Sequence, residues 1–309
     1  MLRYIIKRLL GAIPTLLVLV TVSFFLIRVA PGGPFDSEKE LPIEIQKNIA
    51  AKYHLDEPLY QQYFRYLQDI IQGDFGPSYQ YKDFSVNQLI YKGFPVSLKI
   101  GGSALLFALI MGIFIGTMAA LKQNSWADYM LMSSAMLGIS IPNFVIAPVL
   151  ILFFAVHHHW FPAGGWGDGQ WQHLILPVFA LSLRYIAYIA RLMRGSMIEV
   201  LTADYIRTAK AKGLSTTQIV LKHALKPALM PVVSYLGPAA AGILTGSVVI
   251  EKIFGVPGLG QYFVQGALNR DYTLVMGVII FIGVMIIVFN LIVDLLYLFL
   301  DPKIRQRHN

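Results

Sequence analysis

The sequence lacks cysteine altogether and contains little charge. Without cysteine there are no disulfides, thiolate metal sites or cysteine nucleophiles. The absence of cysteine is compatible with both an oxidising and a reducing compartment. Charged residues make up 14% of the 309 positions, against about 25% in a typical soluble domain. Apolar residues make up 56%, and the mean hydropathy is +0.60. These values exclude a disordered chain and leave too little polar surface for a soluble globule. The sequence predicts an integral membrane protein.

Motifs for chemistry are also missing. There is no G-x-x-x-x-G-K-[ST] loop to hold nucleotide phosphates, and the glycines between Gly255 and Gly260 have the wrong spacing for a dinucleotide loop. We interpret the latter as a tight extracytoplasmic turn. The consecutive histidines His157 to His159 have no nearby carboxylate, so a loop at the membrane interface is favoured over a metal site. The sequence contains no combination of serine, histidine and carboxylate residues that would indicate an enzyme.

Apolar runs of about 20 residues, the length needed to cross a bilayer, occur six times. They predict an all-α protein with spans at 9–29, 96–121, 130–156, 174–193, 230–250 and 272–300. The first could be a cleaved signal peptide, but it is too long and ends in Ala30-Pro31-Gly32 rather than at an A-x-A-like site. Pro142 and Pro148 predict a kink in the third span.

The distribution of lysine and arginine predicts the orientation. Each terminus carries three, and the connection from Arg191 to Lys226 carries seven, whereas residues 30–95 hold six basic and nine acidic residues. Because short basic loops stay in the cytosol, we expect both termini to be cytosolic. Three regions follow: a cytosolic N-terminus with the first span (1–29), an extracytoplasmic domain (30–95), and a five-helix core (96–309). Short amphipathic helices are expected within 43–67, with Leu59, Tyr63, Tyr66 and Leu67 on one face.

The long cytosolic connection, about 191–228, has its own helical signals. A helix is expected from Asp204 to Lys212, ended by Gly213, and a second helix is expected from a Ser215 cap to a point near Pro227. Two short basic helices could dock into a groove on a partner protein. Alternatively, the two helices could lie on anionic lipid. Composition alone favours this second interpretation.

A resemblance to a known family favours the partner. The stretch Asp204-Tyr-Ile-Arg-Thr-Ala-Lys-Ala-Lys-Gly213, with the later His223-Ala-Leu-Lys-Pro, resembles the EAA loop of binding-protein-dependent ABC importer permeases. Arg207-Thr-Ala stands where other subfamilies have Glu-Ala-Ala, as in the peptide and nickel group. The segments around Arg28-Val-Ala-Pro-Gly, Gly73-Asp-Phe-Gly-Pro-Ser and Asp301-Pro-Lys are similar to OppB-type oligopeptide permeases, and the resemblance covers nearly the whole chain.

The resemblance implies a MetI-like fold of six helices in the bacterial inner membrane. It also implies a second homologous permease, two cytosolic ATPase subunits that bind ATP and Mg²⁺, and an extracytoplasmic binding protein that delivers peptide. No cofactor of its own and no nucleic acid are expected. The residues implied in coupling to an ATPase subunit are Asp204, Tyr205, Arg207, Ala209, Lys210, Gly213 and His223.

Two charged residues stand out within the spans. Arg184 lies near the centre of the fourth and Asp294 near an end of the sixth. A charge exposed to lipid costs about 2.5–3.5 kcal/mol on the most lenient scale, so Arg184 is the candidate for the substrate pathway. Import of dipeptides or nickel is the alternative within the family. An ion-coupled secondary transporter is the alternative from another class, but it predicts inverted repeats and mid-membrane carboxylates, and neither is found.

The pairs Gly112-x-x-x-Gly116 and Gly242-x-x-x-Gly246 place small residues on one helix face. They predict close helix packing within the bundle or against a partner.

Overall fold

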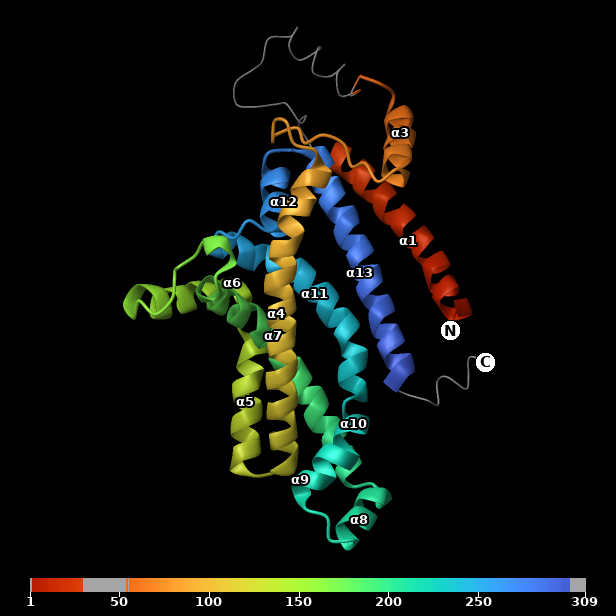
Figure 1. Cartoon of the computed structure of the whole chain (residues 1–309). Helices are drawn as coiled ribbons and strands as arrows, with labels where there is room; N and C mark the ends of the chain where they lie inside the picture. The colour runs from red at the N-terminus through yellow and green to blue at the C-terminus, as the bar shows by residue number, and fades with distance from the viewer. Residues whose placement is uncertain (1, 30–53, 55, 301–309) are drawn as a thin grey trace. The chain divides into compact units, whose positions relative to one another are not determined.

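The computed structural model describes residues 2–29, 54 and 56–300, and this part of the chain is helical, with no strand beyond an isolated bridge between Pro77 and Ser85. Two compact units are formed. One contains residues 2–96 and 257–285, and the other contains 97–256 and 286–309. Figure 1 shows the order of the helices along the chain. Helices α4 and α13 each run from one unit into the other.

Among the described residues, five helices are long and apolar enough to cross a membrane: α1 (Leu2–Val29), α4 (Val86–Leu121), α7 (Trp171–Leu201), α11 (Met230–Phe254) and α13 (Tyr272–Leu300). The last has the bounds that the sequence predicted. The predicted second span started too late, because helix α4 begins at Val86 and passes through Pro95. The fourth ended too early, because α7 continues through polar residues to Leu201.

The predicted third span is broken in two. Helix α5 (Trp126–Ser140) is followed by α6 (Asn143–Leu150) and the π-helical segment η1 (Ile151–His157), bent by 105° at the break. The kink lies where the sequence placed it. Ile141, before Pro142, is extended at φ −102° and ψ 122°, because the proline ring disfavours helical geometry in the preceding residue. A sixth span exists only if this bent pair is counted as one.

The unit that holds the N-terminus packs α1 against α3 (Leu59–Ile71) through aromatic rings. Phe24 of α1 is fully buried and lies 5.3 Å from the Tyr63 ring and 6.0 Å from the Tyr66 ring, measured between centroids. On the predicted apolar face, Tyr63, Tyr66 and Leu67 are half-buried. Leu59, the first residue of α3, is 51% exposed. The first part of the predicted helical stretch, residues 43–53, lies outside the described residues.

A small core in the same unit joins the start of α4 to α12 (Leu259–Leu268) and α13. Val86, Leu89 and Ile90 pack with Leu259, Leu274 and Val278, all buried. The spans predicted at 230–250 and 272–300 left residues 252–271 as a connecting loop, but helix α12 forms within it. The turn before it is as predicted: Gly255 adopts φ +64° and ends α11.

Asp271 ties the loop before α4 to the start of α13. Its fully buried carboxylate accepts hydrogen bonds from the Ser78 hydroxyl, from the backbone N–H groups of Tyr79 and Gln80, and from Thr273 and Leu274. Because five donors reach its two oxygens, this buried carboxylate has the hydrogen bonds that its burial requires. The loop is thereby held to a helix nearly two hundred positions later in the chain.

In the other unit, glycines allow neighbouring helices to approach one another closely. A Cβ on Gly112 would lie 2.7 Å from Ile189, and one on Gly116 would lie 2.5 Å from the Ala190 carbonyl oxygen. Gly138 of α5 approaches the Leu183 carbonyl as closely, so α4 and α5 both rest on the backbone of α7. The predicted packing role of the Gly112 and Gly116 pair is confirmed.

Candidate functional site

The basic connection after α7 is shorter and more ordered than the sequence suggested. Since α7 continues to Leu201, the irregular part is only Thr202 and Ala203 before α8 (Asp204–Ala211) begins. The Glu199 carbonyl, in the last turn of α7, accepts from the Thr202 hydroxyl at 2.7 Å and from the Thr202 N–H at 3.2 Å. Helix α8 is therefore attached to a spanning helix by only two residues.

Helix α8 is amphipathic. Ile206 and Ala209 are buried, at 0% and 6% exposed, and all its other residues are exposed. Ala209 therefore contributes packing. The outer face carries Asp204, Tyr205, Arg207 and Lys210. The Asp204–Arg207 ion pair, at 3.4 Å, joins two highly exposed side chains and contributes little to stability.

The turn after α8 has the predicted geometry. Gly213 adopts φ +79°; its N–H donates to the Lys210 carbonyl at 2.9 Å, and the Leu214 N–H donates to the Ala209 carbonyl at 3.3 Å. These two bonds define a Schellman motif, in which the residue at positive φ is usually glycine. A Cβ on Gly213 would meet nothing within 4 Å, so only backbone conformation restricts this position.

Ser215 caps the next helix, as predicted. Its hydroxyl accepts from the Gln218 N–H at 3.4 Å, and the Gln218 side chain accepts from the Ser215 N–H at 3.1 Å, forming a capping box. The helical segment ends near Pro227, as predicted, at Ala228. It runs as α9 (Thr216–Ile219), η3 (Val220–Ala224) and α10 (Leu225–Ala228), and Leu229 stays helical before α11 begins. Helix α8 is thus connected to one spanning helix on each side.

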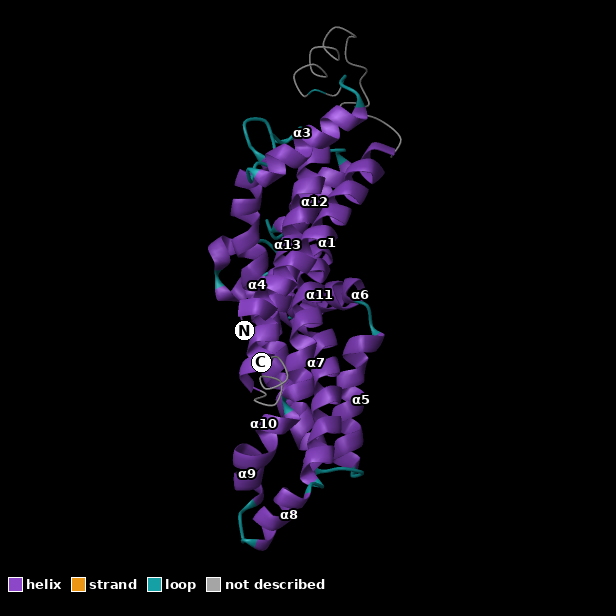
Figure 2. Cartoon of the chain, turned by 90° about the vertical axis from the view of Figure 1, so that its right-hand side faces the viewer, coloured by secondary structure: helices purple, strands orange, loops and turns teal. Residues whose placement is uncertain are grey.

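The exposed surface of the segment from α8 to α10, here the coupling segment (203–228), is basic with isolated apolar groups. Its charges are one acid, Asp204, against Arg207, Lys210, Lys212, Lys222 and Lys226. His223 is exposed beside them. Tyr205 and Leu221 are 49% and 64% exposed. Both views show α8 and α9 at the same end of their unit as the turn between α4 and α5 (Figures 1 and 2). A compact basic surface with two exposed apolar side chains is suited to binding another protein.

An ion pair that the sequence did not predict ties the base of α7 to this turn. The Arg194 Nε and Nη2 atoms donate to the two carboxylate oxygens of Asp128 at 2.7 and 2.6 Å. Asp128 is 1% exposed and also accepts from the Asn124 N–H at 3.0 Å. From the sequence, Arg194 was interpreted as one of the cations of the cytosolic connection. No local pattern links it to Asp128, which lies 66 positions earlier in the chain.

Arg184 lies elsewhere on α7. It is exposed, and its guanidinium carbon is 5.9 Å from the centre of the Tyr188 ring. Seventeen residues separate it from Leu201, about 25 Å of helix. The structure therefore does not bring it to the coupling segment.

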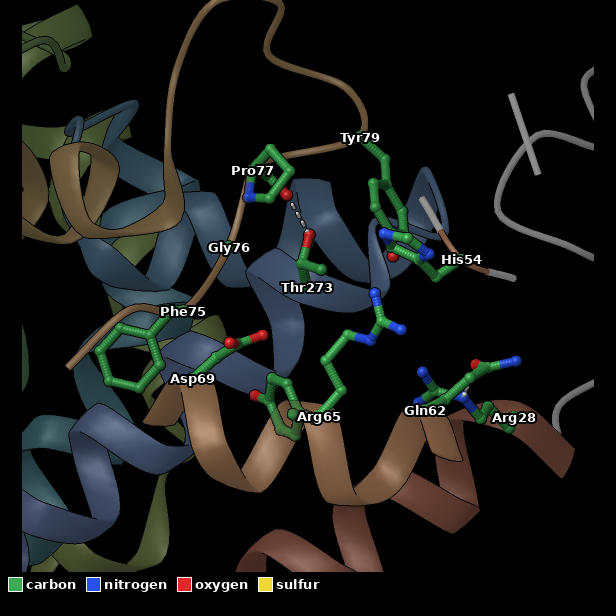
Figure 3. Close-up of a pocket in the computed structure, with 11 residues that line it drawn as sticks. Arg28, His54, Gln62, Arg65, Asp69, Phe75, Gly76, Pro77, Tyr79 and Thr273 are labelled. Atoms are coloured by element: carbon green, nitrogen blue, oxygen red, sulfur yellow. Dashed lines mark hydrogen bonds between the residues drawn. The ribbon is translucent and has the colours of Figure 1, made fainter. Parts of the chain in front are cut away.

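The other unit contains a polar recess of about 170 Å³. Side chains from α1, α3, the 75–79 loop and the start of α13 converge on it, and Thr273 donates to the Pro77 carbonyl at its edge (Figure 3). Its charges have both signs, from Arg28, Arg65 and Asp69. The Arg28 guanidinium is stacked 3.5 Å above the Phe24 ring. Burial raises the pKa of the Tyr66 phenol in the lining.

Comparison with known proteins gives the family. Residues 112–306 match the model described as "binding-protein-dependent transport system inner membrane component", and residues 1–100 match its N-terminal companion. The chain is 60% identical to the oligopeptide transport system permease protein OppB of Haemophilus influenzae and 57% identical to that of Escherichia coli, over 99% of this chain and 100% of each relative. It is 51% identical to the dipeptide transport system permease protein DppB of Bacillus subtilis, over 99% of this chain and 98% of the relative.

Solved structures support the fold. An inward-facing methionine ABC transporter, MetNI, aligns with a TM-score of 0.60 at 19% identity, over 69% of this chain and 97% of that one. A bacterial alginate importer aligns with a TM-score of 0.54 at 13% identity, over 82% and 98%. The predicted all-helical, MetI-like fold is confirmed.

Proposed function

The chain belongs to the family of binding-protein-dependent transport-system inner-membrane components, and we propose that it is the permease subunit of an ATP-driven oligopeptide importer. Its relatives over the full length are permease proteins of oligopeptide and dipeptide transport systems. As a member of this family it is a multi-pass inner-membrane subunit that carries no ATPase of its own and works with separate ATPase and substrate-binding subunits.

The finer assembly is part of the proposal. This chain pairs with a second homologous permease, and two ATPase subunits bind the cytosolic side, where both termini also lie. The chain holds no cofactor, because ATP and Mg²⁺ are bound by the ATPase subunits. The absence of a phosphate-binding loop from the sequence supports this division of labour.

The observation that carries the proposal is the construction of the coupling segment. Two residues join α8 to α7, the Schellman turn and capping box fix α8 against α9, and α10 runs nearly without interruption into α11. Movement of an ATPase subunit against the outer face of α8 is therefore passed to two spanning helices at once. When the ATPase subunits close on ATP, α7 and α11 rock and the pathway opens toward the binding protein. When they separate, the pathway opens to the cytosol.

Cross-linking tests this contact. Because the chain has no cysteine, Lys210→Cys introduces a single thiol on the exposed face of α8. In membranes with the complete importer it should cross-link to an ATPase subunit, and ATP should change the yield. Tyr91→Cys, at a position 82% exposed in the other unit, is the matched control and should not. Absence of the Lys210 adduct would contradict the assignment and favour a segment that lies on lipid.

The polar recess supports a second part of the proposal, that residues 30–95 are extracytoplasmic and help to receive the binding protein. Charges of both signs around one recess offer complementary contacts to a protein surface. A thiol introduced at Gln80, which is exposed, should react with an impermeant maleimide in intact cells. Labelling only after permeabilisation would reverse the topology.

The choice between oligopeptides and dipeptides can be made by uptake. Proteoliposomes with the four membrane and ATPase subunits and the binding protein should accumulate tri- to pentapeptides when ATP is present. Accumulation of dipeptides alone would assign the chain to the narrower substrate class of its 51% identical relative.

A further inference from the structure

A stripe of cationic and aromatic side chains runs along α7 and is completed by α11. Arg184, Tyr188 and Arg191 are four and three residues apart, so they share one helix face. The guanidinium carbons of Arg184 and Arg191 lie 5.9 and 5.4 Å from the centre of the Tyr188 ring. The ring of Tyr235, from α11, lies 5.7 Å from that of Tyr188. These four residues are the arginine–tyrosine stripe.

The stripe lies on a helix that qualifies as a membrane span, yet both arginines are exposed. Within the described part of the chain, neither is recorded in an ion pair. Arg194, one turn beyond Arg191, is by contrast held by the buried Asp128. A charged side chain facing hydrocarbon is costly, and such residues ordinarily face water or a polar partner. The surface that carries the stripe is therefore unsuited to lipid.

The positions of the two arginines form a ladder. Arg184 follows Trp171 by about 20 Å of helix, and Arg191 lies about 10 Å further toward the coupling segment. An anion moving along this face would pass from one guanidinium to the next, with the intervening tyrosine ring stabilising both cations.

We propose that the arginine–tyrosine stripe binds the C-terminal carboxylate of the peptide in transit, an inference that rests on the proposed function. Peptides of different sequence share only their backbone and termini, and the carboxylate is their one shared anion. A planar guanidinium binds a carboxylate through two parallel hydrogen bonds. The same cations would repel the ammonium terminus, so the stripe also gives the peptide a preferred direction.

The experiment compares one peptide with a free C-terminal carboxylate against the same peptide with a C-terminal amide. The complete importer is reconstituted in proteoliposomes, and the binding protein is saturated with each peptide. Arg184→Gln is measured relative to wild type in each case. Because the binding protein is identical throughout, its own preference for either peptide cancels in the ratio of variant to wild type.

The expected result is a selective loss. Arg184→Gln and Arg191→Gln should each reduce uptake of the carboxylate peptide about tenfold, as for removal of one hydrogen bond to a charged group, and of the amide peptide less than twofold. Arg184→Lys keeps the charge but loses the paired hydrogen bonds, so it should keep part of the preference that Arg184→Gln loses. Lys122→Gln removes an exposed cation from the turn after α4 and should leave both rates unchanged. If Arg184→Gln does not accumulate in the membrane, Arg191→Gln and Arg184→Lys still give the two opposite expectations.

Two results would overturn the inference. Equal losses for both peptides would mean that the stripe pairs with a carboxylate of another subunit or with a lipid phosphate, and unchanged uptake of both would mean that it has no role in passage. In either case wild-type uptake remains intact. A wild-type importer that takes up neither peptide with ATP would instead contradict the proposed function.

Discussion

The ion pair between Asp128 and Arg194 gives a sharp prediction about stability. Asp128 is 1% exposed with Arg194 in place. Replacement of Arg194 by alanine removes the two charged hydrogen bonds and leaves the carboxylate with the Asn124 N–H and its own helix terminus. Because Arg194 is 28% exposed and water can reach the carboxylate once it is removed, the loss of these charged hydrogen bonds should cost about 1–3 kcal/mol. The opposite replacement, Asp128→Asn, should cost less, because the Arg194 side chain is 28% exposed and can be hydrated.

A double variant separates the interaction energy between Asp128 and Arg194 from the cost of losing each side chain. Arg194→Ala with Asp128→Asn removes both charges and should recover part of the loss, giving a coupling energy of about 1–2 kcal/mol, within the range for residues in direct contact. Unfolding of the purified subunit in mixed micelles, followed by tryptophan fluorescence, measures all four corners of the cycle. Arg207→Ala, which removes the exposed pair with Asp204, is the control and should leave stability unchanged.

The pair also predicts a functional effect. It holds the base of α7 to the turn after α4, and α7 leads to α8 within a few residues. Arg194→Ala should therefore reduce uptake more than it reduces the amount of assembled importer. If Arg194→Ala unfolds at the wild-type denaturant concentration, the burial argument for Asp128 is wrong.

Three further variants test local features. Gly213→Val forces a β-branched residue to φ +79°, at a cost of about 1–3 kcal/mol; the subunit should still insert, but uptake and substrate-stimulated ATP hydrolysis should collapse, and wild-type transport would remove the coupling role. Gly116→Ala should weaken packing of α4 on α7, since its Cβ would lie 2.5 Å from a carbonyl oxygen; Gly102→Ala, with open space around it, is the control, and equal thermal stability of the two would refute the contact. Asp271→Ala removes the acceptor for five hydrogen bonds and should expose the 78–81 loop to proteolysis in intact cells; an unchanged cleavage rate would show that the loop is held by other contacts.

Local chemistry in the sequence determined a large part of this protein. Apolar runs identified the long helices, because a spanning segment must be apolar whatever its neighbours are. Gly213 and Ser215 were identified because positive φ and helix capping are requirements of single positions. The helix at residues 272–300 was bounded correctly because Asp271 and Pro302 flank a long, mainly apolar run.

Boundaries set by packing were less predictable. Helix α7 continues beyond its apolar part to Leu201, and α12 forms where only a loop was expected. In both cases residues far away in the chain cover one face: Met197 is fully buried within α7, and Leu259 packs on Val86 and Leu274. Periodicity over a short polar segment does not reveal such cover.

The pairings themselves were decided by tertiary structure alone. Asp128 meets Arg194, and Asp271 meets Ser78, across long stretches of chain whose local sequence has no signal for the other partner. Tyr235 contacts Tyr188 because α11 packs against α7. Arg184 could be identified from the sequence as a charge in a span, but the tyrosine pair beside it is formed by this packing. The sequence fixes which groups need a partner, because burying a charge or a polar group is costly wherever it occurs. Which partner each group meets depends on how the helices pack.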